Sequence, residues 1–274
     1  MQLLSEFNEL SVKSVHLTLY RNDIELGKAT GFIVKDESTF YLVTNWHVLS
    51  GRSPYDGQPH HEQGAVPNLV KMCFMFAPIE GSMTEHAGIQ AERLVDEYEN
   101  NLWIEHPDGR KVDVALLKLE NPRSLKADVL DIDKFSEVNL MPEVGMTVFI
   151  VGYPFGKGTT SVNIHPYFSF PVWKTGHIAS EPSMLYNDNP AVLIDATTRE
   201  GMSGSPVYIR PISFYRPLDN PNVRRIGDNP VKFLGIYSGR LNIQTGDDSA
   251  ISSELGLVWN PSVVKEIIAV NQSN

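Results

Sequence analysis

The sequence predicts an all-β protein of the sandwich or barrel class, and two observations support this prediction. Short segments rich in β-branched and aromatic residues recur along the chain, and glycine, proline or asparagine bounds most of them. Helical periodicity is weak everywhere except near the C-terminal end. The 274 residues, of which 42% are hydrophobic, suffice for one large domain or two small ones.

Six short strands are expected in the first half of the chain. Residues 12–20 mix β-branched and aromatic side chains with partial alternation, which is typical of a half-buried strand. Residues 31–34 and 41–44 flank a polar Lys-Asp-Glu-Ser turn, and together they predict a β-hairpin. The remaining strands are expected at residues 71–76, 102–105 and 114–119.

The strand pattern weakens between residues 120 and 141, where we place the seam between two β units. Six more strands are then expected, at residues 147–151, 175–179, 191–195, 206–209, 232–237 and 257–259.

One helix is expected, at the end of the chain. Pro261 follows Asn260 at a first helical position, and the valines and isoleucines at 263, 264, 267 and 268 recur with helical spacing. Two long loops are expected at residues 51–68 and 211–230, because both are rich in turn-forming residues. The pair His60-His61 lies in the first loop without further ligands at metal-site spacing, so we expect no metal there.

Composition excludes several functional classes. The chain has 23 Lys+Arg against 33 Asp+Glu, a net charge of −10, which argues against a nucleic-acid-binding surface. Its apolar runs, such as residues 148–151, are far below the ~20 residues of a membrane helix. Residues 1–6 lack the features of a secretory signal, and the single cysteine, Cys73, fits a reducing compartment. We therefore expect a cytoplasmic protein without nucleic-acid or membrane partners.

Three local patterns carry chemistry when they are taken together. Residues 44–48, Thr-Asn-Trp-His-Val, come directly at the end of an expected strand. Their histidine, His47, is either a structural residue or a general base. Asp113 enters the apolar run 114–117, either as a cap or to orient a buried imidazole. Residues 201–207, Gly-Met-Ser-Gly-Ser-Pro-Val, form either a simple tight turn or a turn that exposes the Ser203 hydroxyl.

The ordered set resembles the chymotrypsin-like (trypsin-like) serine proteases, whose nucleophile motif is usually Gly-x-Ser-Gly-Gly-Pro. The chain order His, Asp, Ser is that of this family. Residues 151–156 and 175–180 are similar to the bacterial HtrA-like branch, although no room remains for a PDZ domain. The resemblance implies two six-stranded antiparallel β-barrels and a C-terminal helix. Residues 8–125 would carry His47 and Asp113, and residues 126–274 would carry Ser203.

The resemblance also implies a serine endopeptidase that acts on polypeptides through an acyl-enzyme. His47 would be the general base, Asp113 would orient it, and Ser203 would be the nucleophile. The N–H groups of Gly201 and Ser203 would form the oxyanion hole. No cofactor and no metal are expected.

Met202 stands where trypsin-like zymogens carry an aspartate, so activation by a freed N-terminus is not expected. This leaves open a second hypothesis, a trypsin-fold interaction module that is catalytically silent or activated by a protein or effector. Substrate would enter a pocket built from Thr197, Thr198, Ser238, Gly239 and Arg240. We expect it to prefer an uncharged side chain, or an acidic one if Arg240 points inward.

Overall fold

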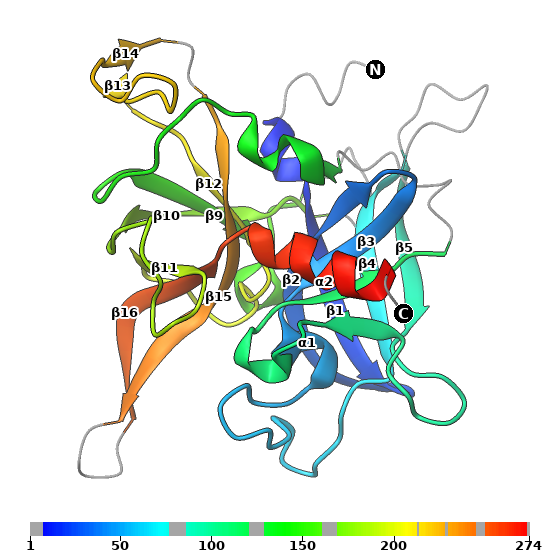
Figure 1. The fold of residues 1–274 in the computed structure, drawn as a ribbon. Helices are drawn as coiled ribbons and strands as arrows, with labels where there is room; N and C mark the ends of the chain where they lie inside the picture. Colours follow the sequence, from blue (N-terminus) through cyan, green and yellow to red (C-terminus); the bar gives the residue numbers. More distant parts are fainter. Residues whose placement is uncertain are drawn as a thin grey trace, which may run out of the picture.

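The structure is a computed structural model, and it describes residues 8–76, 86–120, 129–160, 169–212, 214–227, 230–244 and 250–272. These residues form two antiparallel β units that lie side by side, with the C-terminal helix between them (Figure 1). The all-β prediction is therefore confirmed at the level of fold class.

The first unit is an eight-stranded sheet in the order β5-β4-β1-β2-β3-β7-β6, with β8 pairing in parallel to β2. The expected hairpin is confirmed, since Val34 pairs with Tyr41 across β2 and β3. Strand β5 was not expected from the sequence, and β2 begins well before residue 31. The bounds are β1 (Ser14–Arg21), β2 (Ile24–Asp36), β3 (Thr39–Thr44), β4 (Leu69–Phe76), β5 (His86–Arg93), β6 (Trp103–Glu105), β7 (Ala115–Lys118) and β8 (Leu130–Asp131).

The prediction of two closed six-stranded barrels is wrong for this first unit, which is an open sheet. In the part of the chain that the structure describes, its edge strands are joined only through the bridge between Val95 and Asn101. The chain turns sharply there, because the Asp96 carboxylate accepts hydrogen bonds from the N–H groups of Tyr98 and Asn100. The two segments therefore run together too briefly to build a ladder.

The second unit is a closed barrel of six strands in the order β10-β11-β16-β15-β12-β9, as predicted. Residues 211–230, expected to be a loop, contain a separate two-stranded sheet of β13 and β14, which projects from the barrel in Figure 1. The bounds are β9 (Thr147–Gly152), β10 (Val172–Ile178), β11 (Ala191–Asp195), β12 (Pro206–Ile209), β13 (Phe214–Tyr215), β14 (Arg225–Ile226), β15 (Lys232–Gln244) and β16 (Ala250–Trp259).

Two α-helices lie in the described residues, and only the second was expected. Helix α1 (Trp46–Ser50) follows β3 directly and ends at Gly51, whose left-handed φ of 65° suits glycine. Helix α2 (Ser262–Gln272) begins where the Asn260 side chain accepts a hydrogen bond from the N–H of Ser262. Four short 3₁₀ helices complete the described chain, η2 (Glu9–Val12), η3 (Gly109–Lys111), η5 (Ile132–Ser136) and η6 (Pro154–Gly156).

The hydrophobic core has three parts, one in each β unit and one between them. The four aliphatic residues of α2, from Val263 to Ile268, pack in the middle cluster together with Phe32 of β2 and Tyr208 of β12. This shared core fixes the two units against each other, which positions residues from both at one cleft. The predicted division at residue 125 stays a prediction. Among the described residues, no helix has the length and apolar character needed to cross a bilayer.

Candidate active site

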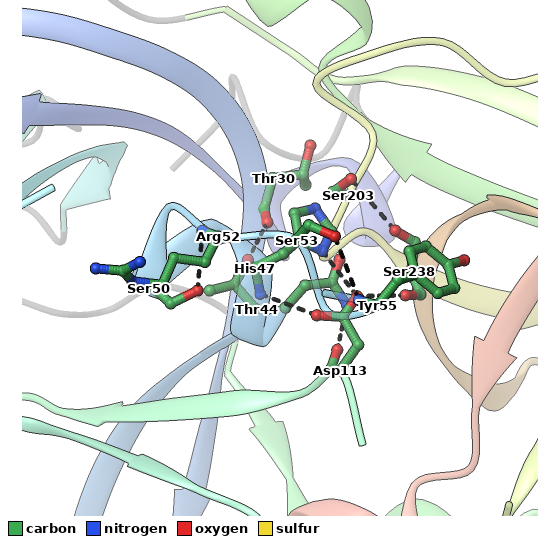
Figure 2. A network of polar contacts seen from close by, with 11 residues as sticks. Thr30, Thr44, His47, Ser50, Arg52, Ser53, Tyr55, Asp113, Ser203 and Ser238 are labelled. Carbon is green, nitrogen blue, oxygen red and sulfur yellow. Dashed lines mark hydrogen bonds and ion pairs between the residues drawn. The ribbon is translucent and has the colours of Figure 1, made fainter. Parts of the chain in front are cut away.

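His47 lies on α1, in the first turn after strand β3, and faces Asp113. Its Nδ1 is 2.7 Å from Oδ2 of Asp113, and its backbone N–H donates to Oδ1 at 2.9 Å (Figure 2). Because a carboxylate faces Nδ1, the neutral ring holds its proton on that nitrogen. Nε2 is then left as a proton acceptor on the opposite side of the ring.

Asp113 lies just before β7 and is only 3% exposed. The hydroxyl of Ser238 donates to Oδ2 at 2.5 Å, in addition to the two contacts from His47. The Asn45 amide donates to the backbone carbonyl of Asp113 at 2.7 Å and fixes the segment. A buried carboxylate is costly unless donors surround it, and this one has three. Its orientation toward His47 is therefore set by a complete set of partners.

Ser203 lies in a tight turn whose shape depends on two glycines. Gly201 and Gly204 have φ values of 87° and 81°, which side chains disfavour. A Cβ on Gly204 would lie 2.1 Å from the carbonyl oxygen of Thr30. Thr30, on β2, donates from its hydroxyl to the Gly201 carbonyl at 2.7 Å and from its N–H to the Ser203 carbonyl at 3.0 Å. The first β unit thus holds both sides of the turn.

The Ser203 hydroxyl donates to the carbonyl of Ser238 at 3.3 Å. No hydrogen bond joins it to His47 within the described residues, yet both side chains line one cavity of about 160 Å³. The backbone N–H groups of Gly201 and Ser203 have no acceptor in the described part of the chain. Two unengaged donors beside a serine hydroxyl can bind an oxyanion.

The five residues predicted to bind substrate do not all lie in the cleft. Ser238, Gly239 and Arg240 line a second cavity of about 140 Å³ together with His47 and Asp113. Thr198 is buried, and its hydroxyl contacts that of Tyr237. Thr197 is exposed and donates to the Glu254 carboxylate at 2.8 Å. The structure therefore brings three of the five together with the candidate base.

His60 belongs to this cleft, although the sequence analysis considered it only as a metal ligand and did not select it as a site residue. Its ring meets that of His47 edge to face, with centroids 5.9 Å apart, and it lines both cavities. Partial burial lowers the pKa of His60, and the nearby charge of protonated His47 acts in the same direction. The loop of residues 51–68 folds back toward α1, because the His60 N–H donates to the carbonyl of Gly51. A contact made through a loop closure leaves no local sequence signal.

A larger cavity, of about 450 Å³, lies elsewhere, where the start of α2 meets β11, β15 and β16 of the second barrel. We assign the site to the two smaller cavities, because His47 and Ser203 line one of them and His47 and Asp113 line the other. Those residues also include no group of three His, Cys, Asp or Glu side chains placed to hold a metal.

Comparison with known proteins places this cleft in a family. No curated protein matches the chain. The inactive form of the Rv3671c protease from M. tuberculosis, as a serine-to-alanine mutant, is similar at 17% identity and TM-score 0.46, over 100% of this chain and 91% of that one. The serine endoprotease from Yersinia pestis is similar at 13% identity and TM-score 0.45, over 95% and 62%. The model of the trypsin-like peptidase domain matches residues 29–210, which include His47, Asp113 and Ser203. Because that match spans more than half of the length of this chain, the chain belongs to the family of trypsin-like peptidase domains.

Proposed function

We propose that the chain is a serine endopeptidase that hydrolyses peptide bonds in polypeptides through an acyl-enzyme. The observation that carries this proposal is the 2.7 Å contact between His47 Nδ1 and Asp113 Oδ2, beside a cavity that His47 shares with Ser203. Family membership supports a peptidase but assigns no residue its role.

The chemistry follows from the protonation of the ring. A serine hydroxyl is a weak nucleophile at neutral pH, so His47 Nε2 takes its proton as Ser203 Oγ attacks the scissile carbonyl. His47 then returns the proton to the leaving amine, and water hydrolyses the resulting ester by the same steps. Asp113 keeps the proton of the neutral ring on Nδ1 and stabilises the imidazolium that forms.

The negative charge that develops on the carbonyl oxygen needs donors of its own. The N–H groups of Gly201 and Ser203 supply them in this proposal, since both lack other acceptors among the described residues. A single donor of this kind is worth ~10²–10³ in turnover, because it is engaged fully only in the transition state.

One observation favours a second candidate, a peptidase held at rest until a partner activates it. Ser203 Oγ donates to the Ser238 carbonyl rather than to His47, so the hydroxyl must rotate before it can react. Met202 is fully buried in the barrel core and offers no carboxylate to a freed N-terminus. Activation would then come from a protein or effector that reshapes the cleft.

Kinetics of single and double variants test the proposal. Ser203→Ala, His47→Ala and Asp113→Asn should each remove nearly all hydrolysis of a mixed peptide library while melting curves stay close to that of the parent. Residues that act as one unit are non-additive, so a Ser203/His47 double variant should be barely slower than either single one. Measurements with and without cell extract separate the resting form from a constitutive enzyme. Normal turnover by Ser203→Ala would refute the mechanism.

A further inference from the structure

The cleft differs in charge from the rest of the molecule. The chain has a net charge of −10, yet the cationic or titratable bases on the two cavities beside His47 are Lys28, His60, His61 and Arg240. Of the described residues, Asp113 contributes the only carboxylate that lines either cavity, and it is buried and fully hydrogen-bonded. An anionic group that enters the cleft therefore meets cations and no exposed carboxylate along these walls.

Among the residues that the structure describes, Arg240 has no partner that would neutralise it. It lies on β15 opposite Gly256 of β16, and it is half-buried. Among the described residues it forms no ion pair and no hydrogen bond, although a guanidinium carries five donors. The nearby Glu254 carboxylate accepts instead from the Thr197 hydroxyl. The donors of Arg240 are thus available to a ligand.

The position of Arg240 also suits a substrate side chain. Gly239, the preceding residue, has open space where its Cβ would be, so an extended peptide can lie against this strand. Burial raises the pKa of Tyr237 to about 12, the hydrogen bond to Thr198 opposes the rise, and the positive charge of Arg240 opposes it further. Tyr237 is buried in the core of the second barrel, so the positive charge of Arg240 reaches the interior of that barrel as well as the cavity that Arg240 lines.

We propose that Arg240 is a specificity-determining residue that binds an aspartate or glutamate of the substrate, in the residues that precede the scissile bond. The substrate class is then acidic polypeptides. This inference rests on the proposed peptidase function. A planar guanidinium pairs with a carboxylate through two parallel hydrogen bonds, which an amide or an ammonium cannot reproduce.

Lys28, on the other cavity, is a weaker candidate for the same role. It already pairs with Glu25 at 3.4 Å, and both side chains are exposed. Exposed pairs of this kind contribute little, so we expect only a small preference for acidic residues after the scissile bond.

The test uses matched peptides that carry Glu, Gln or Lys at one position before the scissile bond. With the parent protein, kcat/KM should be ~10–100-fold higher for Glu than for Gln, the range of one charge-assisted pair, and the ratio should fall as salt rises. Arg240→Gln should bring the Glu/Gln ratio close to one. Arg240→Glu should reverse the order and favour Lys.

Arg224→Glu is the matched control, because it makes the same charge change at a residue that packs on the Phe214 ring beside β14, away from the cleft. It should leave the Glu/Gln ratio unchanged. If the parent protein is inactive by itself, the same peptides are tested with the protein after activation by cell extract. Equal rates for Glu and Gln, or a preference that survives Arg240→Gln, would overturn the role of Arg240. Absence of all cleavage and of fluorophosphonate labelling in both forms would instead refute the peptidase itself.

Discussion

Thr30→Val should weaken both the fold and the reaction, because the Thr30 hydroxyl joins the first β unit to the nucleophile turn. The hydroxyl donates to the Gly201 carbonyl at 2.7 Å and accepts from the Tyr153 N–H at 3.0 Å (Figure 2 shows Thr30 beside Ser203). Thr30 is fully buried, so no water replaces it after substitution. Valine has nearly the same shape and keeps the β-branched form suited to β2.

The size of the effect follows from the two groups that lose their partner. An unsatisfied buried donor or acceptor costs ~1–3 kcal/mol, so the pair should cost about 2–4 kcal/mol after partial relaxation. For a chain of this length 1 kcal/mol corresponds to roughly 2–4 °C, which gives a melting temperature about 5–15 °C lower. Thr30→Ser is the control, since it keeps the hydroxyl and loses one methyl group, about 1 kcal/mol.

Turnover should fall further than stability explains. The Gly201 carbonyl belongs to the Gly201–Met202 peptide, which is next to the peptide that carries the Gly201 N–H. Its release should therefore loosen the orientation of that donor, and full loss of such a donor costs ~10²–10³. We expect kcat to fall about 10–100-fold in Thr30→Val at a temperature well below its melting point, and to change less than about threefold in Thr30→Ser. Melting curves and saturating peptide hydrolysis measure the two effects. If Thr30→Val matched Thr30→Ser in both, the coupling between the β units would be refuted.

Three further predictions follow from other positions. Gly204→Ala should destabilise the fold by at least about 3 kcal/mol, because the new Cβ would clash with the Thr30 carbonyl and because Gly204 has a φ of 81°. The control is Gly27→Ala, whose Cβ would meet nothing within 4 Å, so the melting temperature should stay unchanged or rise slightly. Burial lowers the pKa of His16, and the charge of Lys28 lowers it further while that of Glu25 raises it. The folded state therefore resists protonation of His16, so the contribution of His16 to stability is present above pH 6.5 and is lost as pH falls toward the lowered pKa. His16→Phe should flatten the dependence of melting temperature on pH between 5 and 7, and an unchanged slope would contradict this origin. EDTA should leave hydrolysis unchanged, and loss of activity that zinc restores would reveal a metal.

Local sequence pattern predicts an element correctly where the residue types of the segment suit that element. The β-branched and aromatic run at residues 41–44 lies in β3, and the expected helix at the C-terminal end is α2. Strand β5 escaped prediction because its sequence, His-Ala-Gly-Ile-Gln-Ala-Glu-Arg, has little β-propensity and forms a strand through its pairing with β4. Helix α1 has only five residues, too few for helical periodicity to be visible.

The candidate site shows the same limit more sharply. The motifs around His47, Asp113 and Ser203 are local, so their residue types could be identified from the sequence. The supporting contacts are not local, since the Thr30 hydroxyl reaches Gly201 across 171 residues and Ser238 reaches Asp113 across 125. Such pairs are determined by the packing of the two β units, which no single segment encodes.

The central claim is that Ser203 is the nucleophile, and the position of a covalent adduct tests it most directly. The protein, with and without cell extract, is treated with a fluorophosphonate, and intact mass and peptide mapping locate the label. Ser205→Ala is the matched control, because this serine lies two residues away and its hydroxyl is buried. We predict a single adduct on Ser203 that persists in Ser205→Ala and disappears in Ser203→Ala. A label that remains in Ser203→Ala, or none on the parent protein in either condition, would contradict the account.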